Sequence, residues 1–184
     1  VIGGGAAGLV AVTAGAALGA KTVLIEKDKL GGDCTWYGCI PSKALLKSAQ
    51  VFSLFKRLKE FGIFSGDNKY DASQVMAHVR EIVNKISAHH PAEVFEKQGI
   101  KVLFASPKFI DKNTIELSGA QISAKRFIIA SGSHPMVPPI EGLKDIDYLT
   151  NENVFDLKIL PKSLVVLGGG PIGMELSQAF ARLG

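Results

Sequence analysis

A glycine-rich turn at the start of the chain constrains its fold more than any other feature. Gly3, Gly5 and Gly8 form a Gly-x-Gly-x-x-Gly pattern between an apolar strand end and a helix-like run of small residues. The next apolar run ends in an acid, Glu26. This order is typical of a dinucleotide-binding unit, in which the backbone approaches a pyrophosphate and the acid binds a ribose hydroxyl. We therefore expect an α/β fold with a doubly wound, Rossmann-like domain.

The same pattern returns near the end of the chain. Gly168, Gly170 and Gly173 follow the apolar run "SLVVL" and precede the helix-like run "PIGMELSQAFARLG". This unit is expected to begin a second nucleotide-binding domain, for NAD(P)H. The residue that would distinguish NAD from NADP belongs to a following strand that the sequence does not contain. Because the chain opens without Met inside an apparent strand and stops just after a helix, we expect a fragment of a longer protein.

Between the two turns, the pattern predicts two helices and a small antiparallel insertion. One helix is expected from Pro41 to before Gly62, and another from about Ala72 to the residues before Pro91. Short β-branched runs at about 100–123 indicate the antiparallel insertion, and "RFIIAS" indicates a further buried strand. We expect a first domain over residues 1–140, a linker over 141–162 and a truncated second domain over 163–184.

Composition excludes several classes of function. The 21 basic and 17 acidic residues give a net charge of +4, but Lys and Arg are scattered, so nucleic-acid binding is not expected. The most apolar run, residues 6–20, is shorter than the roughly 20 residues that span a bilayer, and no secretory signal is visible. With only two cysteines, a disulfide scaffold is excluded, and we expect a cytoplasmic protein.

Both cysteines lie close together, at Cys34 and Cys39. Such a pair can hold a metal, be buried and inert, or form a redox disulfide. A metal site needs further ligands, and the histidines lie outside any Cys/His spacing pattern, so no metal is expected. Cys39 begins a helix that continues with Pro41, and the positive end of a helix favours a thiolate. Lys43, one turn further on, can contact a cofactor, pair with an acid or simply face solvent.

Taken in order, these segments resemble a known family. "GGDCTWYGCIPSK" is similar to the active-site segment of the class I flavin disulfide reductases, which include dihydrolipoamide dehydrogenase, glutathione reductase and mercuric reductase. "ASGSHP" at residues 130–135 looks like the flavin motif of this family, and "GGGPIGMEL" looks like its second nucleotide turn. The resemblance covers essentially the whole chain.

The resemblance implies a role for each motif. The first glycine turn, Glu26 and Gly32 would bind FAD, and Ser131 and Gly132 would contact its flavin end. Cys34 would attack substrate, whereas Cys39 would be the charge-transfer thiolate beside the flavin. Lys43 and Glu175 would pair near the isoalloxazine ring. NAD(P)H would bind at the second turn, made by Gly168, Gly170 and Gly173.

Departures from the family pattern narrow the range of expected substrates. The first helix lacks arginines and Pro171 occupies the position of a flavin-gating tyrosine, which disfavours glutathione. Trp36 stands where many members have Asn, and Ser131 replaces the common Thr. The resemblance favours an enzyme like mercuric reductase, with dihydrolipoamide dehydrogenase as the alternative. A non-catalytic flavin-binding thiol sensor is a third possibility, against which the second glycine turn argues.

The expected substrate is thus Hg(II) or a small-molecule disulfide. The full-length protein is expected to be a homodimer whose C-terminal interface domain completes the active site. Because that domain is absent from this sequence, the chain alone is expected to be inactive.

Overall fold

The computed structural model describes residues 1–64 and 71–184. The chain divides into two compact units, residues 1–36 with 86–134, and residues 37–85 with 135–184. Its helices are α1 (Ala6–Ala17), α2 (Gly32–Trp36), α3 (Cys39–Lys56), α4 (Ala72–Ser87), α5 (Ala92–Glu96) and α6 (Pro171–Leu183). Its strands are β1 (Val23–Glu26), β2 (Lys101–Phe104), β3 (Lys108–Asp111), β4 (Thr114–Leu117) and β5 (Ala120–Ser123).

The first unit is organised around parallel pairing. Strand β1 pairs in parallel with β2, and Ile2 forms parallel bridges with both Ile25 and Ile129. The order across the unit is therefore β2, β1, Ile2 and Ile129, all parallel. From Ile2 the chain adds β1 and β2 on one side, and the later segment at Ile129 on the other. This is the strand order of a doubly wound α/β fold, whose ligands bind where the order reverses.

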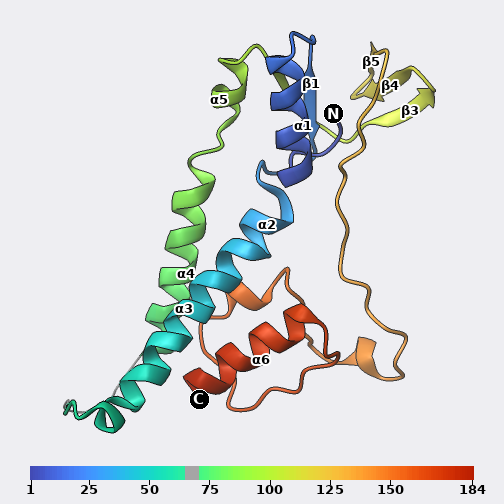
Figure 1. Ribbon diagram of the computed structural model, residues 1–184. Coiled ribbons are helices and arrows are strands. Elements are labelled where there is room, and N and C mark those ends of the chain that lie inside the picture. Colours follow the sequence, from blue (N-terminus) through green and yellow to red (C-terminus); the bar gives the residue numbers. More distant parts are fainter. Residues whose placement is uncertain (65–70) are drawn as a thin grey trace. The chain divides into compact units, whose positions relative to one another are not determined.

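Helix α1 covers β1 because both contribute to one apolar core (Figure 1). Val12 and Leu24 are fully buried there, together with Leu30, Phe95, Ile100 and Val102. Burying one side chain of this size contributes roughly 1.5–3 kcal/mol. The core thus fixes the helix start directly above the carboxyl end of β1, where the glycine turn lies.

A small antiparallel sheet follows β2, in the order β3–β4–β5. Leu117 pairs with Ala120, so Ser118 and Gly119 form a two-residue hairpin loop, and both have positive φ. The predicted antiparallel insertion is therefore present over residues 108–123. Its first predicted strand was wrong, however, because residues 101–104 pair in parallel with β1. A local apolar pattern does not specify which strand becomes the neighbour.

The second unit is helical in its described part. Helices α3 and α6 lie side by side (Figure 1), and Lys56 Nζ donates a hydrogen bond to the Arg182 carbonyl, 2.8 Å away. The fully buried residues Leu45, Ala49, Met76, Val79 and Ala179 form the centre of their shared core. The predicted helix over this region is confirmed, but it ends earlier than predicted: α3 stops at Lys56, and a separate 3-10 turn over Leu58–Phe61 continues to Gly62, whose φ is 72°.

One predicted strand is reduced to a single bridge and another is absent. Ile129 forms only a single bridge, and it is exposed together with Ile128. Residues 163–168 carry no strand, and Val165 and Leu167 are exposed. A strand requires a hydrogen-bonded neighbouring strand, and no described segment pairs with residues 163–168 in this way.

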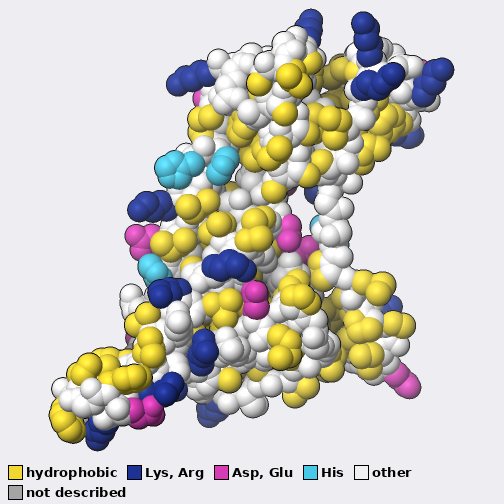
Figure 2. Space-filling view, viewed as in Figure 1, with side chains coloured by type: hydrophobic (Ala, Val, Ile, Leu, Met, Phe, Trp, Pro, Cys, Tyr) yellow, Lys and Arg dark blue, Asp and Glu magenta, His cyan; other side chains and the backbone are white. Residues whose placement is uncertain are grey.

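Apolar side chains gather on the surface at the end of α3 and in the residues that follow it (Figure 2). Phe61, Ile63 and Phe64 are all exposed there, so they add nothing to the core of the second unit. Across residues 1–64 and 71–184, the structure contains no helix with the length and apolar character needed to cross a bilayer.

Candidate functional site

The first glycine turn is shaped by close backbone approach. Gly3 has a φ of +102°, and a Cβ there would lie 2.1 Å from the Ala130 carbonyl oxygen. A Cβ at Gly8 would lie 1.8 Å from the Gly3 carbonyl oxygen. Helix α1 begins after Gly5 without a side-chain cap. The first-turn N–H groups of a helix have no partner within it, so this end is suited to an anion.

Glu26 lies beside this turn at the end of β1 and is only 8% exposed. The Gly4 N–H donates to Glu26 Oε2 at 2.6 Å, and the Asp28 N–H donates to Oε1 at 2.8 Å. Each carboxylate oxygen can accept more than one hydrogen bond. Glu26 therefore holds the glycine turn in place and can still accept a hydroxyl donor.

The segment that carries Cys34 is attached to the same turn by backbone groups. The Gly31 N–H donates to the Gly4 carbonyl at 2.9 Å, and Gly5 forms a parallel bridge with Gly31. A Cβ at Gly32 would lie 2.5 Å from Gly5 Cα. Cys34 follows in α2 as a half-buried residue. The nucleotide-type turn and the cysteine-bearing loop are thus one packed assembly.

Ser131 and Gly132 approach the turn from the neighbouring strand segment. The Ala130 N–H donates to the Ile2 carbonyl at 2.7 Å, which places the backbone of Ala130 and Ser131 against Gly3. Gly132 has a φ of +74° and lies in open space. Both residues therefore lie at the carboxyl end of the parallel segments, the edge where ligands bind in this fold.

In the second unit, Cys39 is the first residue of α3 and is exposed. Lys43 follows one turn later, and its Nζ lies 3.5 Å from Glu175 Oε2 on α6. These side chains are 65% and 42% exposed, and exposed ion pairs contribute at most about 1 kcal/mol to stability. Stability alone therefore gives little reason for this pair.

The second glycine turn repeats the backbone of the first. Gly168 has a φ of +105°, and a Cβ at Gly173 would lie 2.4 Å from the Gly168 carbonyl oxygen. Gly170 is the N-cap of α6, again without a side-chain hydrogen bond, and Pro171 opens the helix. The internal repeat expected from the sequence is therefore present in the geometry.

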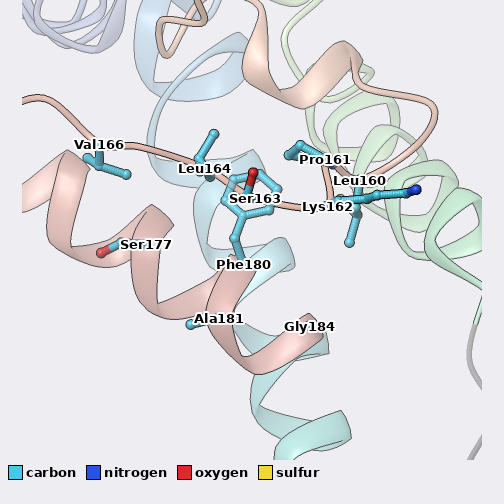
Figure 3. A pocket seen from close by; sticks show the side chains of 10 residues that line it. All are labelled: Leu160, Pro161, Lys162, Ser163, Leu164, Val166, Ser177, Phe180, Ala181 and Gly184. Carbon is cyan, nitrogen blue, oxygen red and sulfur yellow. The ribbon is translucent and has the colours of Figure 1, made fainter.

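A cavity of about 300 Å³ lies in the second unit, away from the predicted residues. Figure 3 shows Phe180 pointing from α6 toward Leu164, with Val166 and Ser177 further along the same opening. None of the predicted site residues lines it. Its lining is largely apolar and carries no group suited to redox chemistry.

The structure places the predicted residues in two groups, one in each unit. The first unit brings the first glycine turn together with Glu26, Gly32, Cys34, Ser131 and Gly132. The second unit holds Cys39, the Lys43–Glu175 pair and the second turn. The pairing of Cys34 with Cys39, and the role of each residue, stay predictions. Within the described ranges, no three His, Cys, Asp or Glu side chains gather as a metal site.

Sequence reasoning missed the residues that join the turn to the cysteine loop. Gly4 fills an unassigned position of the motif, yet a Cβ there would lie 2.6 Å from Leu30 Cδ2. Gly31 has a φ of +103° and would place a Cβ against Thr35. Three successive glycines at 3–5 and two at 31–32 were the available signal, because glycine pairs mark close backbone approach.

Comparisons with known proteins agree across the full chain. A family model described as pyridine nucleotide-disulphide oxidoreductase matches residues 1–184. A mercuric reductase of Lysinibacillus sphaericus is 36% identical over 184 residues, covering 100% of this chain and 34% of that protein. A dihydrolipoyl dehydrogenase of Acholeplasma laidlawii is 35% identical over 189 residues, covering 100% of this chain and 56% of that protein.

Among solved structures, the chain is similar to the HOCl-induced flavoprotein disulfide reductase RclA from Escherichia coli. The TM-score is 0.83 at 28% sequence identity, covering 100% of this chain and 39% of that one. The same protein has also been solved as a Cu(II) complex. The chain thus spans about a third of the length of the mercuric reductase from Lysinibacillus sphaericus and about half that of the dihydrolipoyl dehydrogenase.

Proposed function

Because the chain belongs to the pyridine nucleotide-disulphide oxidoreductase family, we propose that its full-length protein is an FAD-dependent oxidoreductase. It passes two electrons between NAD(P)H, FAD and a Cys34–Cys39 disulfide. One observation carries the proposal: the glycine turn and the loop bearing Cys34 are joined through Gly31 and Gly4, with a hydrogen bond of 2.9 Å. A turn suited to a dinucleotide is therefore bonded to the segment that carries a thiol.

The residues of the first unit fit the ADP half of FAD. The glycines at 3, 5 and 8 leave no side chain between the backbone and a pyrophosphate, and α1 starts there without a cap. Glu26 lies beside the turn with acceptor capacity for a ribose hydroxyl. We assign Gly32, Ser131 and Gly132 to the walls of the same site.

When bound, FAD supplies a ring that accepts a hydride from a nicotinamide and returns the two electrons to a disulfide. Lys43 and Glu175 form an ion pair, and we assign to it the setting of the charge near the flavin ring. Gly168, Gly170 and Gly173 form the turn to which we assign NAD(P)H.

The thiols carry out exchange in two balanced steps. In the reduced protein, the Cys34 thiolate attacks one sulfur of a disulfide substrate, so that a Cys34–substrate disulfide forms and the other sulfur leaves as a thiolate. The Cys39 thiolate then attacks Cys34 Sγ, which restores the Cys34–Cys39 disulfide and releases the second substrate thiolate. Protons from solvent neutralise the two products.

The substrate we propose is Hg(II), with a small disulfide of the dihydrolipoamide type as the alternative. Relatives named mercuric reductase and dihydrolipoyl dehydrogenase support the two choices about equally by identity. A pair of thiolates suits both, since thiolates bind soft metal ions and also exchange with disulfides.

The domain plan remains part of the proposal. We assign residues 1–140 to the FAD-binding domain, 141–162 to a linker and 163–184 to the start of the NAD(P)-binding domain. The two turns with equal backbone geometry support one nucleotide site at each end of the chain. The full-length protein is proposed to act as a homodimer.

The test is an anaerobic visible spectrum of the full-length protein with FAD, before and after two-electron reduction. Wild type should develop a long-wavelength charge-transfer band, and Cys39→Ser should lack it. Flavin bleaching without such a band in either protein would contradict the proposed contact between Cys39 and the flavin. A flavin that stays oxidised after NAD(P)H is added would instead favour the thiol sensor.

Turnover measurements distinguish the two proposed substrates. NAD(P)H consumption is compared with Hg(II) in the presence of excess thiol and with oxidised lipoamide, for wild type and Cys34→Ser. Turnover with Hg(II) that Cys34→Ser abolishes would support the metal reductase. Turnover with oxidised lipoamide alone would support the alternative.

A further inference from the structure

Trp36, the only tryptophan of the chain, closes the loop that contains Cys34. Its Nε1–H donates a hydrogen bond to the Leu30 carbonyl at 2.9 Å. The bond joins the two ends of the segment 30–36, with Cys34 two residues before the donor. Its length is typical of an N–H···O hydrogen bond. The Trp36–Leu30 hydrogen bond, called the clasp below, therefore closes segment 30–36, the cysteine loop.

The acceptor end of this clasp is fixed in the core. The Leu30 side chain is 7% exposed and packs with Val12, Leu24 and Phe95. Leu30 Cδ2 also lies against Gly4, where an added Cβ would come within 2.6 Å. A hydrogen bond to the Leu30 carbonyl thus ties the cysteine loop to the packed part of the first unit.

A second contact holds the ring itself. Lys29 Nζ lies 4.8 Å from the centre of the Trp36 ring, within the range of a cation–π contact. Trp36 is half-buried while Lys29 is exposed. The ring is thus held by the N–H bond at its edge and by the ammonium over its face.

We propose that Trp36 is a positioning residue for Cys34, and this inference rests on the proposed function of Cys34 as the thiol that attacks substrate. Reducing a Cys34–Cys39 disulfide removes a covalent restraint from the loop just before Cys34 must react. The Trp36–Leu30 bond persists in that state and keeps the thiolate oriented. Holding a reacting group in the correct orientation accounts for a large part of the rate enhancement of a reaction.

The experiment compares Trp36→Phe with wild type in the full-length, FAD-loaded protein. Phe keeps an aromatic ring but has no N–H donor. Two half-reactions are followed separately by stopped flow: flavin reduction by NAD(P)H, and reaction of the reduced protein with dithiodipyridine. Lys29→Met keeps the N–H bond and removes the cation, and Tyr37→Phe is the matched control at the neighbouring aromatic residue.

Trp36→Phe should slow the reaction with dithiodipyridine by about three- to tenfold, the range that one neutral hydrogen bond supplies. It should leave flavin reduction unchanged and lower kcat without raising KM. Tyr37→Phe should change neither half-reaction, and Lys29→Met should give a smaller loss than Trp36→Phe. Equal rates in wild type and Trp36→Phe would overturn the proposal, and so would equal slowing of both half-reactions.

A second measurement does not depend on catalysis. Hydrogen exchange of the amides at 31–36 should be about three- to tenfold faster in Trp36→Phe, because the loop opens more often. Unchanged exchange would refute the role of the Trp36–Leu30 bond, whether or not the protein turns over. A wild-type flavin that does not react with NAD(P)H would instead contradict only the proposed function. A Trp36→Phe protein that fails to retain FAD would also refute the positioning role, since the bond would then be stabilising the fold.

Discussion

Replacing Gly3 by Ala should damage the first unit more than replacing Gly19 by Ala. Both glycines have positive φ, +102° and +81°, so an alanine at either position is strained. They differ in their surroundings. A Cβ at Gly3 would lie 2.1 Å from the Ala130 carbonyl oxygen, whereas nothing lies within 4 Å of one at Gly19. Gly19→Ala therefore measures backbone strain alone.

The magnitude follows from these two terms. Positive φ costs a non-glycine residue about 1–2 kcal/mol. The contact at Gly3 is with a backbone atom that cannot rotate away, and forcing such a contact costs about 1–3 kcal/mol more. We expect Gly19→Ala to lose about 1–2 kcal/mol and Gly3→Ala about 2–5 kcal/mol. For a domain of this size, about 2–4 °C of melting temperature accompanies each kcal/mol.

The assay is the temperature at which the full-length protein releases FAD, followed by flavin fluorescence. Gly19→Ala should lower it by a few degrees and Gly3→Ala by about 10 °C, with a lower FAD content after purification. Equal shifts for the two variants would refute the reasoning, because the contact between a Cβ at Gly3 and the Ala130 carbonyl would then add nothing to the destabilisation.

Three further predictions follow from side-chain contacts. Glu26→Gln should lower the FAD release temperature more than the exposed control Glu116→Gln. The Gln amide has one acceptor oxygen for two backbone donors, and a lost hydrogen bond to a charged group costs about 1.5–3 kcal/mol. Equal shifts for the two variants would contradict the role of Glu26. Lys43→Met should slow flavin reduction while changing the melting temperature little, whereas Lys47→Met on the same helix should change neither. A fall in the melting temperature of Lys43→Met as large as its loss of rate would contradict this prediction. Hydrogen bonds from the Ser73 hydroxyl and N–H lower the pKa of Asp71, so its stabilising contribution is present above the ordinary aspartate pKa and is lost as the pH falls through the lowered value. Melting temperatures measured between about pH 5 and 2 should therefore fall more steeply for wild type than for Asp71→Asn, and parallel curves would exclude the contribution.

The glycine turns were predictable because glycine has few other reasons to recur at that spacing. Gly3 and Gly168 adopt nearly the same φ, +102° and +105°, as their shared pattern requires. The long helices were predictable for a similar reason, since a periodic apolar face such as Leu45 with Ala49 is a local property. The antiparallel hairpin was marked by its own turn, Ser118–Gly119.

Pairing partners were not predictable, because they are set by residues distant in sequence. Residues 101–104 read as part of the insertion, yet they add to the parallel sheet beside β1. The hydrogen bond between Trp36 and the Leu30 carbonyl was not predictable either, although Trp36 departs from the family pattern. A pattern reports which residue is present, but not which carbonyl its N–H will reach.

The contact between the cysteine loop and the nucleotide turn is made by main-chain groups, through Gly31 to Gly4 and Gly5. Main-chain anchors do not depend on which side chains follow them. A side chain such as that of Tyr37 can therefore be changed without breaking these contacts to the nucleotide turn. A side-chain change near Cys34 can thus alter the reaction with substrate while the main-chain contacts that hold the proposed cofactor site stay in place.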